Sequence, residues 1–183
     1  SRIQSNVTVT NNGTVSINCN IRGNNATTSR WVQGVNSRLN IGGDLMIIDP
    51  GALEASAAGN TVNYNGANQT IKLPVSSYYN LQVSSTGGTV TIEGAPGSLT
   101  VDNDFTLTSG TVNLNTDNIT VSDTTKIYGS LIDDNVAGTN NFNHVEVYAG
   151  GTINPSVSET FSISGNVTMY GGSFTSSAGN PIY

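Results

Sequence analysis

Six of the twelve acidic residues fall in three short clusters, which are the candidates for a catalytic site. The clusters are Asp102-Asn103-Asp104, Asp117 with Asp123, and Asp133-Asp134. Polysaccharide lyases and glycoside hydrolases use acids that share one face, usually beside an arginine or a lysine. No basic residue lies within these segments, and Lys126 stands alone. Because aspartate favours turns, the pattern indicates turn stabilisation and predicts that the chain is not an enzyme.

The same acids are the only candidates for a metal site. Asp102 and Asp104 offer alternating oxygens of the kind that a hard cation such as calcium binds. Neither the glycine-rich calcium-binding nonapeptide nor a twelve-residue loop that ends in glutamate is present. His144 has no partner at the spacing of metal ligands. Calcium at Asp102 and Asp104 is therefore the one cofactor that the sequence suggests, and otherwise we expect none.

A ligand site is predicted where the sequence pattern breaks. Residues 22–38 lack the short apolar alternation found elsewhere and contain the single tryptophan, Trp31. A connection this long is often functional, so we expect these residues to leave the main body as a loop excursion. An exposed tryptophan stacks on sugars, and arginines bind their polar groups. Trp31, Arg30 and Arg38 are therefore the predicted ligand-binding residues, and surface glycans the predicted ligand.

The elements that position these residues are indicated by composition. Asn, Thr, Ser and Gly make up about half of the 183 residues, and only 10% are charged. Asn and Gly supply tight turns, whereas Thr, Val and Ile suit strands. No apolar run reaches the roughly 18 residues of a membrane helix, so membrane insertion is not expected. The single cysteine, Cys19, excludes an intrachain disulfide, and its apolar surroundings predict a buried thiol.

The charge is negative overall but unevenly distributed. A net charge of −6 and a pI of about 4.4 argue against nucleic acid as the main partner. All four arginines fall at positions 1–38, which hold no acid, while the remainder of the chain holds two lysines and all twelve acids. This split is consistent with a solvated face or with end-to-end complementarity between neighbouring modules.

Short alternations of apolar and polar residues predict strands, and they repeat. Apolar–polar–apolar triplets mark half-buried strands, and they begin, among other places, at Leu39, Leu99 and Phe161. These three starts are almost evenly spaced and are followed by similar segments. Tyr79 and Phe142, which are separated by nearly the same interval, provide a second anchor and are expected in the core. We therefore predict a repeat unit of about 60 residues, which is typical of an array of stacked units.

Stacking explains how such short strands become stable. A strand with one apolar face buries it only when neighbouring units pack on it, as in a solenoid. Antiparallel hairpins would show Asn-Gly or Asp-Gly between the strands, and most junctions here lack them. We expect residues 1–183 to form a single all-β solenoid, a right-handed parallel β-helix that is a fragment of a longer repeat array, with three coils in each repeat unit. A β-sandwich is the alternative.

The segment 59–114 resembles a known family. Its motifs are Asn60-Thr61-Val62-Asn63-Tyr64-Asn65-Gly66, Tyr78-Tyr79-Asn80-Leu81, and Leu99-Thr100-Val101 through Gly110-Thr111-Val112-Asn113-Leu114. They are similar to a repeat of very large surface proteins of Bacteroidetes, which are adhesin-like or gliding-associated, and the similarity covers roughly residues 39–183. The resemblance implies export to the cell surface by the type IX pathway, a β-helical stalk and no enzymatic activity.

The expected function is that of a structural or adhesive repeat module, a stalk or filament segment of a large secreted surface protein. Its expected partners are neighbouring modules of the same chain or copies of itself. A glycan- or surface-binding β-helix module is the alternative, and a polysaccharide lyase is a more distant one.

Overall fold

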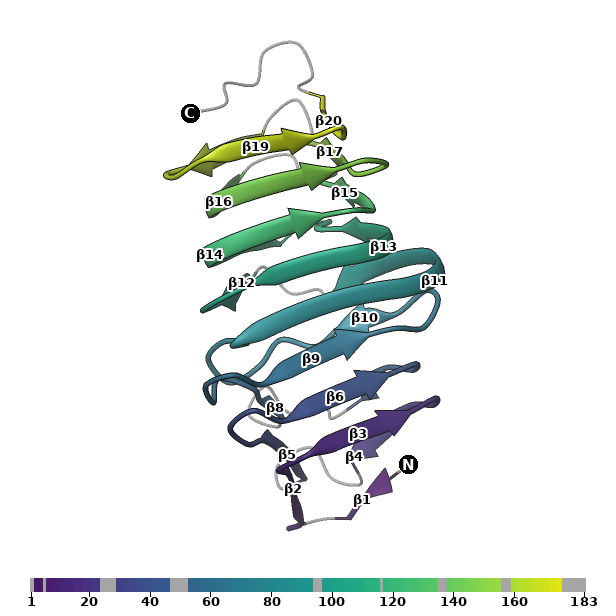
Figure 1. The fold of residues 1–183 in the computed structure, drawn as a ribbon. Coiled ribbons are helices and arrows are strands. Elements are labelled where there is room, and N and C mark those ends of the chain that lie inside the picture. Colours follow the sequence, from purple (N-terminus) through teal and green to yellow (C-terminus); the bar gives the residue numbers. More distant parts are fainter. Residues whose placement is uncertain are drawn as a thin grey trace.

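A computed structural model describes residues 2–4, 6–23, 29–46, 53–93, 97–115, 117–134, 138–155 and 159–175. Within these ranges the chain forms strands β1 to β20 and no helix. The strands pair in parallel and stack as a right-handed β-solenoid of about seven turns (Figure 1). The predicted parallel β-helix is therefore confirmed, and the β-sandwich alternative is wrong.

Each coil contributes strands to three faces, and each face is a column of strands stacked along the solenoid axis (Figure 1). We call these columns face 1, face 2 and face 3. Face 1 comprises β2 (Thr8–Asn11), β5 (Arg30–Gln33), β8 (Leu53–Glu54), β12 (Ser98–Val101), the first halves of β14 (Asn118–Ile127) and β16 (Gly138–Tyr148), and β18 (Glu159–Ile163).

Face 2 runs through the whole described chain. It comprises β3 (Thr14–Ile17), β6 (Arg38–Ile41), β9 (Thr61–Tyr64), the first halves of β11 (Asn80–Ile92) and β13 (Phe105–Asn113), the second halves of β14 and β16, and β19 (Val167–Tyr170).

Face 3 forms two separate groups of paired strands. The first group is β1 (Arg2–Ile3), β4 (Ile21–Gly23) and β7 (Leu45–Met46). The second is β10 (Thr70–Ile71), the second halves of β11 and β13, β15 (Ser130–Ile132), β17 (Thr152–Asn154) and β20 (Ser173–Phe174).

The register gives the length of a coil. A coil takes roughly 20 residues, as is usual for a solenoid, and its length varies along the chain. Successive Cα partners on face 2 are Leu39, Val62, Leu81, Phe105, Thr125, Val145 and Val167. On face 1, Leu99 pairs with Ile119 and Asn140 pairs with Phe161, which places Leu99 and Phe161 in the same column three coils apart. The predicted three coils per repeat unit therefore hold for the interval from Leu99 to Phe161.

Two details of the predicted repeat are wrong. Leu39 lies on face 2 while Leu99 lies on face 1, so these two residues are not equivalent positions of a repeat. Tyr78, not Tyr79, is the positional equivalent of Phe142, because it bridges to Val101 in the same column. Both errors have one physical cause: the short alternating strands look alike on every face, and the coil length varies.

A single apolar core fills the solenoid from Ile3 to Phe161. Period-two alternation places every second strand residue inward, as in β12, where Leu99 and Val101 are buried and Ser98 is exposed. Cys19 is exposed, which corrects the predicted burial of its thiol.

The loop excursion predicted for residues 22–38 is wrong in its described part. Arg30–Gln33 is strand β5, paired on one side with β2 and on the other with β8. The alternation was missed because one inward position carries a glutamine, Gln33, instead of an apolar residue. The Gln33 side chain is accommodated because its Oε1 accepts hydrogen bonds from Asn11 and Trp31. Residues 24–28 lie outside the described ranges.

Since the described ranges contain no helix, none of them supplies a helix long and apolar enough to cross a membrane.

Candidate functional site

The three predicted ligand-binding residues do not converge. Trp31 is only 5% exposed, and its Nε1 donates to Gln33 Oε1 at 2.8 Å, so its ring offers no face to a sugar. Arg30 forms an ion pair with Glu54 at 2.8 Å on face 1. Arg38 lies on face 2, where its guanidinium donates to Asn40 and Gln82. The predicted site is therefore not assembled: one residue is core, and the two cations are occupied by other side chains of the solenoid.

Asp102 and Asp104 also have separate partners. Ser77 Oγ donates to Asp102 Oδ2 at 2.5 Å, and Lys126 Nζ pairs with Asp104 Oδ2 at 3.0 Å. The hydrogen bond to Asp104 raises the pKa of Lys126 above its ordinary value. Within the ranges that the structure describes, no three His, Cys, Asp or Glu side chains gather as metal ligands. The geometry thus gives these two carboxylates roles in linking coils.

Three tyrosines form a stacked ladder at one edge of face 2. The ring centroids of Tyr128 and Tyr148 are 4.1 Å apart with planes at 12°, and those of Tyr148 and Tyr170 are 4.8 Å apart at 23°. Tyr128 and Tyr170 are exposed, at 39% and 52%. The two neighbours cover both ring faces of Tyr148, whereas Tyr128 and Tyr170 each have one ring face covered within the ladder. Each tyrosine follows the previous one by one coil, and that spacing is the signal by which the sequence could have revealed them.

A shallow hollow of about 240 Å³ lies in the rows next to the ladder. It is lined by Thr124, His144, Glu146, Asn166 and Thr168. His144 Nδ1 accepts the backbone N–H of Asn166 at 3.0 Å, and the Tyr148 hydroxyl donates to Glu146 Oε2 at 2.8 Å. The bond to Glu146 raises the pKa of Tyr148. The histidine and the glutamate are thus both engaged within the solenoid.

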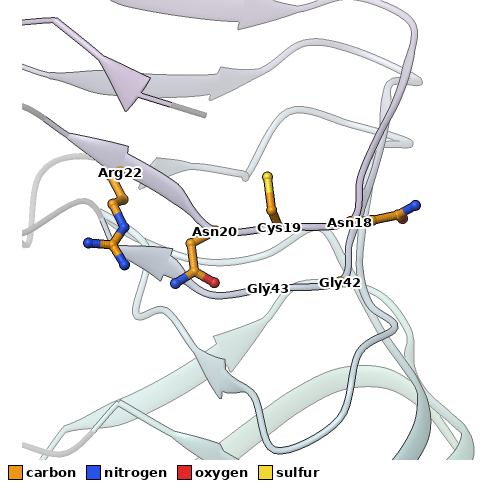
Figure 2. Close-up of a pocket in the computed structure, with 6 residues that line it drawn as sticks. All are labelled: Asn18, Cys19, Asn20, Arg22, Gly42 and Gly43. Atoms are coloured by element: carbon orange, nitrogen blue, oxygen red, sulfur yellow. The ribbon is translucent and has the colours of Figure 1, made fainter.

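A second hollow, of about 460 Å³, lies between two N-terminal coils (Figure 2). We call it the Arg22 hollow, and it is lined by Asn18, Cys19, Asn20, Arg22, Gly42 and Gly43. Figure 2 shows the Asn20 and Arg22 side chains on the same side of their strand and the Cys19 thiol on the opposite side. Gly43 allows the two coils to approach closely here, since a Cβ at this position would lie 2.5 Å from the Asn20 backbone nitrogen.

Two tyrosines and a lysine form a polar network inside the core. The backbone N–H of Lys72 donates to the Tyr64 hydroxyl at 3.0 Å. The Tyr64 and Tyr78 hydroxyls are hydrogen-bonded at 2.9 Å, and the Tyr78 hydroxyl donates to the backbone carbonyl of Lys72 at 2.5 Å. Both tyrosines are 0% exposed. Burial raises the pKa of both phenols above the ordinary value. This network satisfies the backbone of Lys72 within the core and offers no surface to a ligand.

Comparison with known proteins adds no relative. No protein-family model, curated protein or solved structure matches the chain. The resemblance to the Bacteroidetes surface repeats therefore stays a prediction, and function has to be inferred from the geometry of this solenoid.

Proposed function

We propose that the chain is a structural segment of a longer β-solenoid, a non-enzymatic stalk or filament module of a surface adhesin. The observation that carries the proposal is the exposure of core positions at the C-terminal coil. On face 2, Val145 and Val147 are 2% and 0% exposed, whereas their Cα partners Val167 and Met169 are 48% and 44% exposed. Val167 and Met169 thus continue a buried column without being buried themselves.

The inward-facing apolar side chains of the N-terminal coil are also incompletely buried, though less exposed than those of the C-terminal coil. Val15 and Ile17 are only partly buried, while their partners on the next coil, Leu39 and Ile41, are 0% exposed. A further coil stacked on either end would bury these side chains, with a gain of about 1 kcal/mol for each, since at most about half of each side chain is still exposed. The fitting partner is a neighbouring solenoid module or a second copy of the chain.

Contacts on the outer surface support a structural role. Polar side chains on the faces bond from one coil to the next, as Asn63 does to Asn40 at 3.2 Å and Thr152 does to Ser130 at 3.0 Å. The tyrosine ladder adds stacked rings along the same axis. Such links tie each coil to its neighbours in addition to the parallel backbone pairing, which suits a rod.

Sedimentation of the full chain over a range of concentrations tests the proposal. We expect end-to-end association that the double variant Val167→Lys/Met169→Lys abolishes, because buried lysines without partners oppose stacking. Val35→Lys is the matched control, since Val35 is 63% exposed and lies in a turn between β5 and β6. A wild-type chain that remains monomeric at all concentrations, or association that Val35→Lys weakens as strongly, would contradict the proposal.

We extend the proposal to the cell surface because of the resemblance described above. Protease treatment of intact cells that produce the parent protein tests this location. Cleavage of the module in intact cells supports it, and full protection until the cells are lysed contradicts it.

A further inference from the structure

Two of the four arginines have no counter-charge within the described part of the chain. Arg2 and Arg22 are exposed Cα partners on β1 and β4, so their side chains lie side by side on face 3. Among the described residues neither guanidinium has an ion-pair or hydrogen-bond partner, in contrast to Arg30 and Arg38, which bond to other side chains of the solenoid. The free cations of the described N-terminal coils are thus gathered in one row.

The nearest acid among the residues that the structure describes does not neutralise this row. Asp44 lies beside Asn20, since its backbone N–H donates to Asn20 Oδ1 at 2.9 Å. Its own carboxylate is engaged with the next coil, where Oδ1 accepts the Thr70 N–H at 2.9 Å. Like charges opposite each other in a sheet repel, so the arginine row is unfavourable until an anion binds between the two side chains.

The adjoining Arg22 hollow adds groups that recognise sugars. The Asn18 and Asn20 side chains also line it, and Figure 2 shows the Asn20 carboxamide on the side of the Arg22 guanidinium, with Asn18 at the other end of the hollow. Carboxamides donate to and accept from hydroxyl groups, whereas a guanidinium binds carboxylate or sulfate with paired hydrogen bonds. The hollow therefore contains carboxamides that can bind hydroxyl groups and a guanidinium that can bind an oxyanion.

We propose that the row formed by Arg2 and Arg22, together with the Arg22 hollow, binds the carboxylate or sulfate groups of an acidic polysaccharide. The charge distribution favours this occupant over nucleic acid: residues 39–183 carry twelve acids against two lysines, and they repel a continuous polyphosphate. A polysaccharide also offers ring hydroxyls to the Asn18 and Asn20 carboxamides that line the hollow.

Binding of the full chain to immobilised polymers tests the inference. Polygalacturonate supplies carboxylates, dextran sulfate supplies sulfates, and unmodified dextran is the neutral control. We expect binding to one or both acidic polymers that weakens with salt, and about a tenfold loss of affinity for each of Arg2→Ala and Arg22→Ala. Arg22→Lys is expected to retain part of the affinity, since it keeps the charge without the planar fork.

The matched control is the double variant Arg30→Ala/Arg38→Ala, which removes the same charge from the same region. We expect its affinity to stay within about twofold of the wild type, since these arginines already bond to other side chains of the solenoid. Equal losses in the two pairs of variants, equal binding to dextran, or no binding to any polymer would overturn the inference. So would tighter binding to single-stranded DNA, or an arginine-dependent self-association in place of polymer binding. The association test of the end coil uses different variants, so the two proposals can fail separately.

Discussion

Replacing Tyr78 by phenylalanine is the sharpest test of how the core is held together. The change keeps the ring and removes one hydroxyl that belongs to a side chain 0% exposed. That hydroxyl bonds to the Tyr64 hydroxyl and donates to the carbonyl of Lys72, so its loss removes one hydrogen bond from each of two buried groups, although Tyr64 still accepts the Lys72 N–H. Each unpaired buried group costs about 1–3 kcal/mol. We therefore expect the free energy of unfolding to fall by about 2–4 kcal/mol.

Urea unfolding followed by far-UV circular dichroism measures this loss. The matched control is Tyr79→Phe, because Tyr79 is the adjacent residue, is half-buried and takes no part in the network; its expected cost is below about 0.5 kcal/mol. In a double-mutant cycle with Tyr64→Phe, the double variant should cost about 1 kcal/mol less than the sum of the single variants, because both remove the same bond. Equal costs for the variants at Tyr78 and Tyr79, or strict additivity with Tyr64, would refute the reasoning.

Three further predictions concern close approach, buried charge and pH. Gly66→Ala should lower the free energy of unfolding in urea by about 2 kcal/mol or more, because the new Cβ would collide with the Gly42 carbonyl oxygen of the preceding coil. The control Gly13→Ala should be neutral or slightly stabilising, because no atom lies within 4 Å of a Cβ at that position. Glu93→Gln should cost about 1–3 kcal/mol, because Lys72 is 4% exposed in its ion pair; Glu54→Gln, in an exposed pair, should cost below about 1 kcal/mol, and equal costs would contradict the argument. Because burial raises the pKa of both core tyrosines, their contribution is complete below the unfolded value of about 10 and is lost as the pH rises above it. Urea midpoints should therefore fall above about pH 10, and the fall should be smaller when both core tyrosines are phenylalanine.

The strands and their stacking could be predicted because both depend on local features of the sequence. The alternation in Leu99-Thr100-Val101 sets which side chains face inward, and β12 shows that burial pattern. The scarcity of hairpin turns favoured parallel coils, and the pairing is parallel throughout the named strands. Period-two patterning acts within a few residues, so a single sequence suffices to see it.

The assignment of strands to faces could not be predicted in the same way. Leu39 and Leu99 begin similar triplets but belong to different faces, because the turns between strands differ in length and shift the register. Only the pairing between coils decides the face, and that information is spread over partners a whole coil away in the sequence. The same limit misplaced Tyr79 in the core instead of its neighbour Tyr78.

The ligand site predicted from the sequence is not assembled, for a related reason. Arg30, Trp31 and Arg38 are close in sequence, but consecutive strand residues point to opposite sides, so Trp31 faces the core while Arg30 faces solvent. In a solenoid, residues one coil apart are the neighbours. Arg2 and Arg22 are one coil apart and lie side by side. A search for chemically similar residues at the coil spacing would have found them.

On a solenoid surface, similar side chains lie in rows, one from each coil. Side chains that attract one another within a row stabilise the fold, whereas side chains that repel one another favour binding of an external partner. Tyr128, Tyr148 and Tyr170 attract one another, because stacked rings stabilise neighbouring coils without any further partner. Arg2 and Arg22 repel each other and have no counter-charge among the described residues, so their row lowers stability unless an anion neutralises it. The tyrosine ladder is therefore assigned to the rod, and the arginine row to binding.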